Sequence, residues 1–374
     1  MKIGVDIRCL MESRYSGISE YAYNLLKALF EIDTQNQYFL FYNKSKSTFL
    51  PAFKKNNVFL KGFHYPNKLF NLAMKFFKIA EVDKMIGGVD VFLIPNFLFL
   101  NLSADCKKLL IVHDLSFDLY PEFFTAKRRL WHRLIGPKNF CLKADKIVAI
   151  SENTKNDIIK LYGVKENKIV LINPGISELF FTPVTEAAKS EARQKFCLPK
   201  NYIFYLGNLE PRKNVESLIL AFEKVKTPDM HLVIAGSLAW KYNNIKKIWE
   251  NSALKDKIKF LGYVAAEDKP ALYAMAKVFV YPSIYEGFGL PPVESMACGT
   301  PVITGFNSSL IESVADAGLL IDQNNINEIA QSIDLVLNDE KLRNNLKIRS
   351  QAHAQKFHWL DKAQEILNVI ESLK

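Results

Sequence analysis

Short apolar runs alternate with helix-like stretches along almost the whole chain, and this pattern constrains the fold more than any other feature. The alternation predicts an α/β protein with parallel sheets, because consecutive parallel strands need a crossover that is usually a helix. The runs predicted as strands are residues 2–8, 37–43, 57–63, 90–95, 107–114, 146–151 and 168–176 in a first series, and 201–208, 230–236, 258–264, 277–283, 300–305 and 317–322 in a second.

The two series predict two domains. A chain of 374 residues is long for one ordinary domain. Regularity is lost near residues 173–180, so we expect an N-terminal Rossmann-like domain over 1–175 and a C-terminal one over 176–356. Doubly wound sheets bind ligands at the carboxyl ends of their strands, at the topological switch point. Two such domains facing each other would place the site in the cleft between them.

Helical spacing of apolar residues predicts the connections between these strands. The predicted helices are 19–31, 67–86, 125–144 and 152–163 in the first series, and 214–226, 241–253, 267–276, 291–298, 308–315 and 325–337 in the second. The chain has no GxGxxG motif, no Walker motif and no repeat of 20–50 residues. The sequence therefore predicts doubly wound domains that lack these two nucleotide-binding fingerprints.

The excess of positive over negative charge lies entirely in the first half of the chain. The net charge is +10, and residues 1–175 carry 26 Lys/Arg against 16 Asp/Glu, whereas residues 176–374 carry 23 of each. A one-sided basic field attracts nucleic acid, anionic lipid or a phosphorylated substrate. A charge that serves only solubility explains the same numbers. No RNA- or DNA-binding module is legible, so we expect no nucleic-acid partner.

The cysteines and the hydropathy of the chain indicate its compartment. Five scattered cysteines without a CxxC pair favour reduced thiols in the cytoplasm over disulfides or a zinc site. The first ten residues predict a strand, so we expect no signal peptide. No run reaches the roughly 18 apolar residues of a transmembrane helix. We therefore expect a cytoplasmic protein.

Two cations stand at the start of the second series. The predicted strand 201–208 contains Gly207, and Arg212 and Lys213 follow just before a predicted helix. A glycine turn, two cations and the N–H groups of a helix N-terminus together can bind phosphate. A basic loop that only caps the helix is the alternative.

Two glutamates flank a glycine- and proline-rich loop. Glu286 lies in the loop after the predicted strand 277–283, and Glu294 lies near the start of the next helix. Gly287 and Gly289 would let the backbone approach a ligand without Cβ interference. Carboxylates suit hydroxyl-rich ligands because they accept charge-assisted hydrogen bonds. Glu294 could instead be a charge that favours the helix macrodipole.

These stretches resemble a known family. "EGFGLPPVE" (286–294) resembles the E-x7-E element of retaining glycosyltransferases of the GT-B fold, in family 4 (group 1), including those of mannosyltransferase type. "GNLEPRKN", "LVIAG", "FLGYV", "ACGTPVI" and "DAGLLID" follow the family's order and spacing, and the resemblance is strongest over residues 200–325. It implies two Rossmann-like domains facing across a cleft. The segment 357–374 resembles the family's C-terminal helix, which crosses back to the first domain.

The resemblance also implies roles for residues of the second domain. Glu294 would bind the ribose of a nucleotide-sugar donor, and Glu286 would lie beside the transferred sugar. Lys213 matches the family's diphosphate-binding lysine. Many members carry an arginine where this chain has Asn208, and Arg212 would replace that charge. The backbone of Phe288, Gly289 and Leu290 would contact the sugar and the phosphate of the donor.

Three residues of the first domain join this expected site. Gly17 and Ile18 resemble the family's glycine loop, which approaches the donor phosphates or the acceptor. His113 ends a strand where the family carries a histidine at the active cleft, so it would hydrogen-bond the donor sugar or position the acceptor. A histidine with a local backbone partner is the alternative. Ser151 resembles the start of another family helix, where capping is its expected role.

The implied activity is transfer of a sugar with retention of configuration. The donor would be a GDP- or UDP-linked sugar, with mannose from GDP-mannose favoured, and the acceptor a glycan or lipid-linked glycan in cell-surface polysaccharide assembly. The chain has no Asp-x-Asp motif, which favours a site without metal or other cofactor. A nucleotide-sugar epimerase on the same fold, and a non-catalytic nucleotide-sugar-binding partner, are the alternatives.

Two basic stretches predict peripheral contact with the anionic inner face of the cell membrane. Residues 68–80 place polar residues, mainly lysines, on one predicted helical stripe and apolar residues on the rest. A second stretch, "KRRLWHRLIGPK" (127–138), carries further cations around Trp131. An interfacial helix has this composition. A buried helix with a narrow wet edge explains residues 68–80 equally well.

Overall fold

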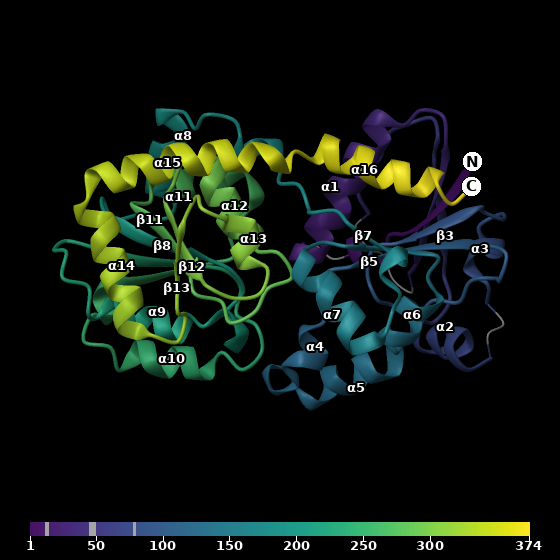
Figure 1. The fold of residues 1–374 in the computed structure, drawn as a ribbon, viewed down its shortest axis with the longest axis horizontal. Helices are drawn as coiled ribbons and strands as arrows, with labels where there is room; N and C mark the ends of the chain where they lie inside the picture. Colours follow the sequence, from purple (N-terminus) through teal and green to yellow (C-terminus); the bar gives the residue numbers. More distant parts are fainter. Residues whose placement is uncertain (12–14, 45–49, 78–79) are drawn as a thin grey trace. The chain divides into compact units, whose positions relative to one another are not determined.

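The computed structural model describes residues 1–11, 15–44, 50–77 and 80–374, and it divides into two compact units. Unit 1 comprises Met1–Leu115, Ala126–Gly175 and Phe357–Lys374, and unit 2 comprises Ser116–Thr125 and Ile176–Lys356. No helix of the described residues is long and apolar enough to cross a membrane. Figure 1 shows the helices and strands of each unit.

Unit 1 contains a seven-stranded parallel sheet in the order β3-β2-β1-β4-β5-β6-β7. Its strands are β1 (Lys2–Asp6), β2 (Gln37–Asn43), β3 (Val58–Phe63), β4 (Val91–Ile94), β5 (Lys107–Val112), β6 (Lys146–Ala149) and β7 (Ile169–Leu171). Its helices are α1 (Gly17–Ile32), α2 (Asn67–Leu72), α3 (Val82–Met85), α5 (Ala126–Ile135), α6 (Pro137–Lys143), α7 (Glu152–Tyr162) and α16 (Trp359–Glu371).

Unit 2 contains a six-stranded parallel sheet in the order β10-β9-β8-β11-β12-β13. Its strands are β8 (Tyr202–Leu206), β9 (His231–Ala235), β10 (Ile258–Gly262), β11 (Val278–Tyr281), β12 (Val302–Gly305) and β13 (Leu319–Ile321). Its helices are α4 (Ser116–Leu119), α8 (Glu186–Lys195), α9 (Val215–Phe222), α10 (Asn243–Glu250), α11 (Lys269–Met275), α12 (Leu290–Ala297), α13 (Leu310–Val314), α14 (Ile326–Asn338) and α15 (Glu340–Ala354).

Both sheets confirm the predicted fold class of two doubly wound, Rossmann-like α/β domains. Every run predicted as a strand forms one, and the central strands are apolar enough to be covered on both faces, whereas the edge strand β3 is partly exposed. All four residues of β11, for example, are buried. In each sheet the chain starts near the middle and reverses direction, between β1 and β4 in unit 1 and between β8 and β11 in unit 2.

The predicted helix 67–86 is wrong. α2 ends at Leu72, a π-helical turn follows over Ala73–Phe77, and α3 begins only at Val82. Residues 78 and 79 lie outside the described part of the chain. Within the predicted stripe Leu69 is exposed and Phe70 is buried, so the apolar residues do not share one environment. The predicted helix 125–144 is also broken, because Gly136 adopts a left-handed φ of 72° between α5 and α6.

The last helix of the chain packs in unit 1. α16 lies against α1 (Figure 1), and Trp359 at its start contacts Tyr21 of α1 with their rings at 5.0 Å. Gly175 lies beneath the same tryptophan, where a Cβ would come within 2.7 Å of the indole ring. A glycine at this position therefore lets α16 sit close to the end of the first domain's chain.

The short segment Ser116–Thr125 belongs to unit 2, although the residues before and after it belong to unit 1. The indole Nε1 of Trp240 donates a hydrogen bond to the carbonyl of Phe123 at 2.6 Å. The ring of Phe124 stacks on Trp240, and the ring of Tyr120 lies 5.3 Å from that of Tyr285. These contacts join tertiary neighbours that are more than a hundred residues apart, so no local pattern in the sequence indicates them.

Candidate active site

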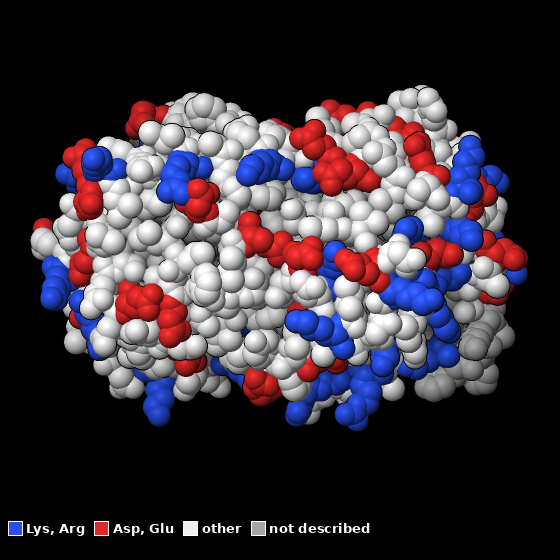
Figure 2. Space-filling model, viewed as in Figure 1, with Lys and Arg blue, Asp and Glu red and all other residues white. Residues whose placement is uncertain are grey.

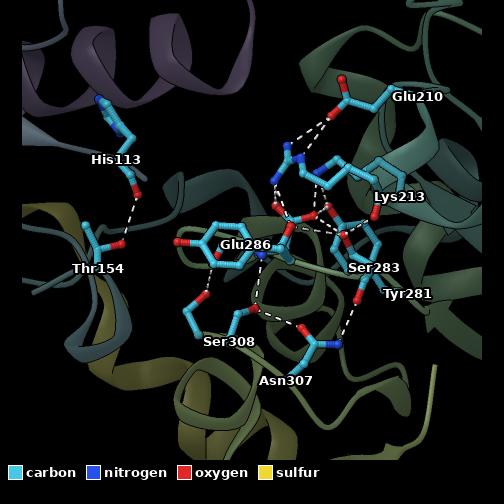
Figure 3. Close-up of polar contacts among 12 residues, drawn as sticks. His113, Thr154, Glu210, Lys213, Tyr281, Ser283, Glu286, Asn307 and Ser308 are labelled. Atoms are coloured by element: carbon cyan, nitrogen blue, oxygen red, sulfur yellow. Dashed lines mark hydrogen bonds and ion pairs between the residues drawn. The ribbon is translucent and has the colours of Figure 1, made fainter. Parts of the chain in front are cut away.

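The switch point of unit 2 gathers most of the predicted site residues. The loop after β8 leads into a short 3-10 turn over Pro211–Lys213, and the loop after β11 leads into α12. Because β8 and β11 are adjacent and parallel, both loops leave the same edge of the sheet. Figure 3 shows Glu210 and Lys213 from the first loop beside Glu286 from the second.

Glu286 is the centre of a buried ion cluster. Its Oε1 accepts hydrogen bonds from Lys213 Nζ at 2.6 Å, from Ser283 Oγ at 2.6 Å and from Tyr281 Oη at 3.0 Å. Its Oε2 accepts one from Arg212 Nη1 at 3.0 Å. Only 6% of the residue is exposed. The carboxylate is therefore held in one orientation by four donors.

The cations determine the ionisation of this carboxyl group. Burial alone would raise the pKa of Glu286, but Arg212 and Lys213 outweigh that effect and lower its pKa to about 2. Burial also lowers the pKa of Lys213, and Glu286 opposes this shift. At neutral pH we assign Glu286 as a carboxylate paired with two cations.

Arg212 acts as a brace rather than as a free cation. Its Nε and Nη2 both donate to Glu210 Oε1, at 3.2 and 3.0 Å, and its Nη1 donates to the carbonyl of Tyr285 at 2.8 Å as well as to Glu286. Two of these hydrogen bonds tie the loop after β8 to the loop after β11, and the other two hold Arg212 against Glu210 within its own loop. The cluster contains two cations and two anions, and Glu210, whose carboxylate pairs with Arg212, was not foreseen from the sequence.

Lys213 lies in a buried aromatic setting. Its Nζ donates to Tyr281 Oη at 2.6 Å and lies 5.2 Å from the centre of that ring. An ammonium has three N–H donors, so the bonds to Tyr281 and Glu286 leave one for another acceptor. Tyr281 and Ser283 were not predicted as site residues, because a tyrosine at a strand end and a serine in a loop are common in any sequence.

Glu294 is buried within α12 and accepts a hydrogen bond from Tyr273 Oη at 2.9 Å. It is the fifth residue of the helix, beyond the first turn where the macrodipole acts most strongly. Burial, together with Glu294, raises the pKa of Tyr273 well above its usual value, so the phenol stays protonated as a donor. A helix-start charge therefore does not account for this residue.

The three-residue segment Phe288, Gly289 and Leu290 leads into α12. Gly289 precedes the helix with φ of 95°, and a Cβ there would lie 2.6 Å from Leu310 Cδ2. Both conformation and packing therefore require glycine. The first N–H groups of a helix have no intrahelical acceptor, and the two prolines after Leu290 have no N–H. The first turn of α12 therefore offers few backbone N–H groups besides that of Leu290.

Gly207 and Asn208 directly follow β8. Asn208 is exposed, and its carbonyl accepts the N–H of Glu210 at 3.1 Å. A Cβ on Gly236, after β9, would come within 1.9 Å of the carbonyl of Gly207, so these loops approach closely. Among the residues that the structure describes, no side-chain hydrogen bond links Asn208 to the ion cluster.

The remaining two predicted residues, His113 and Gly17, lie in unit 1. His113 follows β5, and its Nε2 lies 2.8 Å from the carbonyl of Pro95, which can only accept, so Nε2 carries the proton. Burial lowers the pKa of His113, partly offset by Pro95 and Asp114, which favours the neutral ring. Gly17 starts α1, is exposed, and would find no atom within 4 Å of an added Cβ.

The low pKa of Glu286 predicts a specific loss of stability in acid. A carboxyl with a folded pKa of about 2 against an ordinary 4.5 contributes about 3 kcal/mol above pH 4.5, and this contribution is lost as pH falls toward 2. We expect roughly 2 kcal/mol of it to disappear between pH 5 and pH 3. Denaturant unfolding of the wild type and Glu286→Gln at both pH values measures it. The same pH dependence in both proteins would contradict the assignment.

Comparison with known proteins identifies the family of the chain. The model "Glycosyltransferase Family 4" matches residues 15–178, and "Glycosyl transferases group 1" matches residues 186–353. The O-antigen chain mannosyltransferase B of Escherichia coli is 33% identical over 268 residues, covering 70% of this chain and 69% of that protein. The serotype-specific mannosyltransferase WbdA of Escherichia coli is 29% identical over 59% of this chain, which spans only 28% of WbdA.

Solved structures share the fold over the full chain. Sucrose-phosphate synthase from Thermosynechococcus elongatus has a TM-score of 0.79 at 22% identity, covering 100% of this chain and 98% of that one. Anabaena HepE in complex with UDP and glucose has a TM-score of 0.77 at 21% identity, covering 100% of both chains. The fold is therefore that of GT-B glycosyltransferases. The chain belongs to the family 4 (group 1) glycosyltransferases.

Proposed function

We propose that this glycosyltransferase moves a sugar from a nucleotide-diphosphate donor to a glycan or lipid-linked acceptor, with mannose from GDP-mannose as the favoured donor and with retention of configuration. The observation that carries the proposal is the buried pairing of Lys213 with Glu286 at the switch point of unit 2. The names of the two E. coli relatives support mannose, and the UDP bound to HepE supports a nucleotide donor.

The departing diphosphate requires positive charge. We propose that the third N–H of Lys213, together with the backbone N–H groups from Phe288 to Leu290, stabilises the charge on the leaving phosphate. Electrostatic stabilisation of this kind is worth several kcal/mol when the donors are held in place beforehand. Arg212 contributes by fixing Glu286 through its bonds to Glu210 and Tyr285. The negative charge is thus handled by protein groups, and we propose that no metal takes part.

The carboxylates would hold the two hydroxyl-rich parts of the donor. Lys213 is neutralised by Glu286 before the donor binds, so a phosphate would compete with this carboxylate for the ammonium. A partial release of Glu286 from Lys213 would give its oxygens capacity to accept hydroxyls of the transferred sugar. Glu294, oriented by Tyr273, would accept the ribose hydroxyls. His113 would offer its unprotonated Nδ1 to a hydroxyl of donor or acceptor, and Gly17 would lie near phosphate or acceptor.

Nucleotide binding tests the proposal. We expect GDP or UDP, and the corresponding sugar nucleotide, to raise the unfolding temperature, since a ligand at 100 times its Kd adds about 2.7 kcal/mol. A larger shift with GDP than with UDP would support mannose transfer. The absence of a shift with any nucleotide would contradict the proposal. Release of free nucleotide diphosphate without an acceptor would favour an epimerase instead.

Glu294→Gln is expected to weaken donor binding about 10- to 100-fold and leave kcat little changed, because charge-assisted hydrogen bonds to ribose are worth roughly 1.5–3 kcal/mol in both ground and transition states. Donor titration and steady-state kinetics measure the two quantities. Tyr273→Phe, which removes the donor to Glu294 while preserving the ring, is the matched control and should produce a smaller loss of affinity. Unchanged affinity in both variants would refute the role of Glu294.

A further inference from the structure

The phenol of Tyr205 is a buried hydrogen-bond donor to which the proposed reaction assigns no role. Tyr205 lies in β8 and is fully buried. Within the part of the chain that the structure describes, its Oη makes no hydrogen bond to the protein. Buried hydroxyl groups are ordinarily hydrogen-bonded, because an unpaired one loses its bonds to water without gaining another. The free donor therefore calls for an acceptor.

This hydroxyl lies beside the ion cluster. The ring of Tyr205 stacks on that of Tyr281, with the ring centres 5.8 Å apart and the planes at 18°. Tyr281 Oη donates to Glu286 Oε1 at 3.0 Å, so Tyr205 lies one ring away from that carboxylate. A Cβ on Gly207 would come within 2.7 Å of Tyr205 Oη, which places the hydroxyl against the start of the loop after β8. Burial and the nearby charge of Glu286 raise the pKa of Tyr205 well above its ordinary value, so the hydroxyl keeps its proton.

A bound diphosphate would deprive Glu286 of one of its donors. The phosphate would compete with Glu286 for the ammonium of Lys213, which donates to the carboxylate at 2.6 Å. Tyr281 cannot replace this bond, because its single hydroxyl proton is already donated to Glu286. Glu210 keeps its two hydrogen bonds from Arg212 in this exchange. Glu286 is therefore the carboxylate that needs a new donor when the diphosphate binds.

We propose that Tyr205 is a positioning residue for sugar transfer, whose O–H donates to Glu286 when Lys213 turns to the diphosphate. Figure 2 shows Lys, Arg, Asp and Glu side chains at the surface, where water solvates a charge that loses its partner. Glu286 is buried, so its replacement donor has to come from the protein. The exchange lets Lys213 neutralise the leaving group while Glu286 stays in place beside the transferred sugar.

Removal of Lys213 by mutation tests this exchange on the full chain without any substrate. We expect Tyr205→Phe to leave the unfolding temperature of the otherwise wild-type protein unchanged or slightly raised, because phenylalanine loses no hydrogen bond. In Lys213→Met, Tyr205 would already donate to Glu286, so the same substitution should lower the unfolding temperature by a further 2–4 °C or about that.

Tyr202→Phe is the matched control. Tyr202 is also fully buried in β8, but its hydroxyl donates to the carbonyl of Leu272 at 2.6 Å. Its loss should lower the unfolding temperature by the same amount with and without Lys213, because this bond lies outside the exchange. Thermal unfolding of the single and double variants, followed by circular dichroism, measures all of these differences.

Nucleotide binding and kinetics provide a second test that leaves Lys213 in place. This test rests on the proposed function, whereas the unfolding comparison needs neither donor nor acceptor. At one fixed concentration, GDP or UDP, whichever binds the wild type, should raise the unfolding temperature of Tyr205→Phe less than that of the wild type. The value of kcat/KM for sugar transfer should fall about tenfold in Tyr205→Phe and stay at the wild-type value in Tyr202→Phe.

An equal effect of Tyr205→Phe on the unfolding temperature with and without Lys213 would overturn the proposal, because the hydroxyl would then not respond to the loss of the ammonium. If Lys213→Met does not fold, the nucleotide experiment decides, and an equal shift in Tyr205→Phe and the wild type would overturn the proposal. Wild-type kcat/KM in Tyr205→Phe would overturn the positioning role. A wild type that neither binds nucleotide nor transfers sugar would contradict the proposed function, while the unfolding comparison would still show whether Tyr205 donates to Glu286.

Discussion

Replacing Lys213 with methionine is expected to reduce kcat/KM for sugar transfer by about 10²- to 10³-fold. The ammonium is the cation proposed to meet the leaving diphosphate, and loss of one pre-positioned electrostatic donor commonly costs this much. Methionine occupies a similar volume, so packing against Tyr281 is largely retained. Steady-state kinetics with the donor, together with binding of the free nucleotide diphosphate, measure the effect.

Stability must be separated from catalysis in this variant. Lys213→Met leaves Glu286 buried with one cation fewer, and breaking a buried ion pair costs about 3–5 kcal/mol. The double variant Lys213→Met/Glu286→Leu removes both charges, and we expect it to recover much of the lost free energy of unfolding while remaining inactive. If the single variant keeps wild-type kcat/KM, Lys213 does not contact the donor.

Glu286→Ala is expected to reduce kcat by about 10²-fold or more while changing donor affinity much less. The carboxylate is proposed to lie beside the transferred sugar, where its interactions strengthen as the anomeric carbon gains positive charge, so they act mainly in the transition state. Kinetics at saturating donor and direct titration of the donor separate the two terms.

Ser308→Ala serves as the comparison for Glu286→Ala. Ser308 accepts the backbone N–H of Glu286 at 3.0 Å, so its loss loosens the loop without removing the carboxylate. A decrease in kcat well below that of Glu286→Ala is expected. If Glu286→Ala weakens donor binding as strongly as it slows turnover, Glu286 acts in ground-state binding instead.

The sequence predicts the sheets well because the central strands are short, buried and apolar on both faces. β11 illustrates this, since Val278–Tyr281 is continuous in apolar character and flanked by breakers. The helix 67–86 was mispredicted for the opposite reason. Its apolar residues suit a continuous helix locally, whereas the chain folds into α2, a π-helical turn and α3, with Phe70 and Met74 buried. Tertiary packing determines the secondary structure of such a segment, and the periodicity of its apolar residues does not reveal that packing.

The charged residues of the site could be predicted from the sequence, whereas their hydrogen-bond partners could not. The sequence indicated Arg212 and Lys213 as phosphate-binding cations and Glu286 as a carboxylate for a hydroxyl-rich ligand, and the structure brings the three side chains together. The donors that orient Glu286 could not be predicted from the sequence, because Tyr281 and Ser283 carry no motif of their own. Arg212 was expected as a phosphate-binding cation, and only the structure shows that Glu210 and Tyr285 bind it. Hydrogen-bond partners follow from three-dimensional proximity, which one sequence does not contain.

Calorimetric titration of GDP-mannose into the wild type, Lys213→Met and Glu294→Gln tests the central claim most directly, because it measures donor binding at the switch point of unit 2 without any acceptor. We predict saturable binding to the wild type and an affinity at least about tenfold lower in each variant. UDP-linked sugars titrated in parallel identify the nucleotide. Saturable binding of a sugar nucleotide with equal affinity in all three proteins would contradict the claim, since the donor would then bind somewhere other than this cluster.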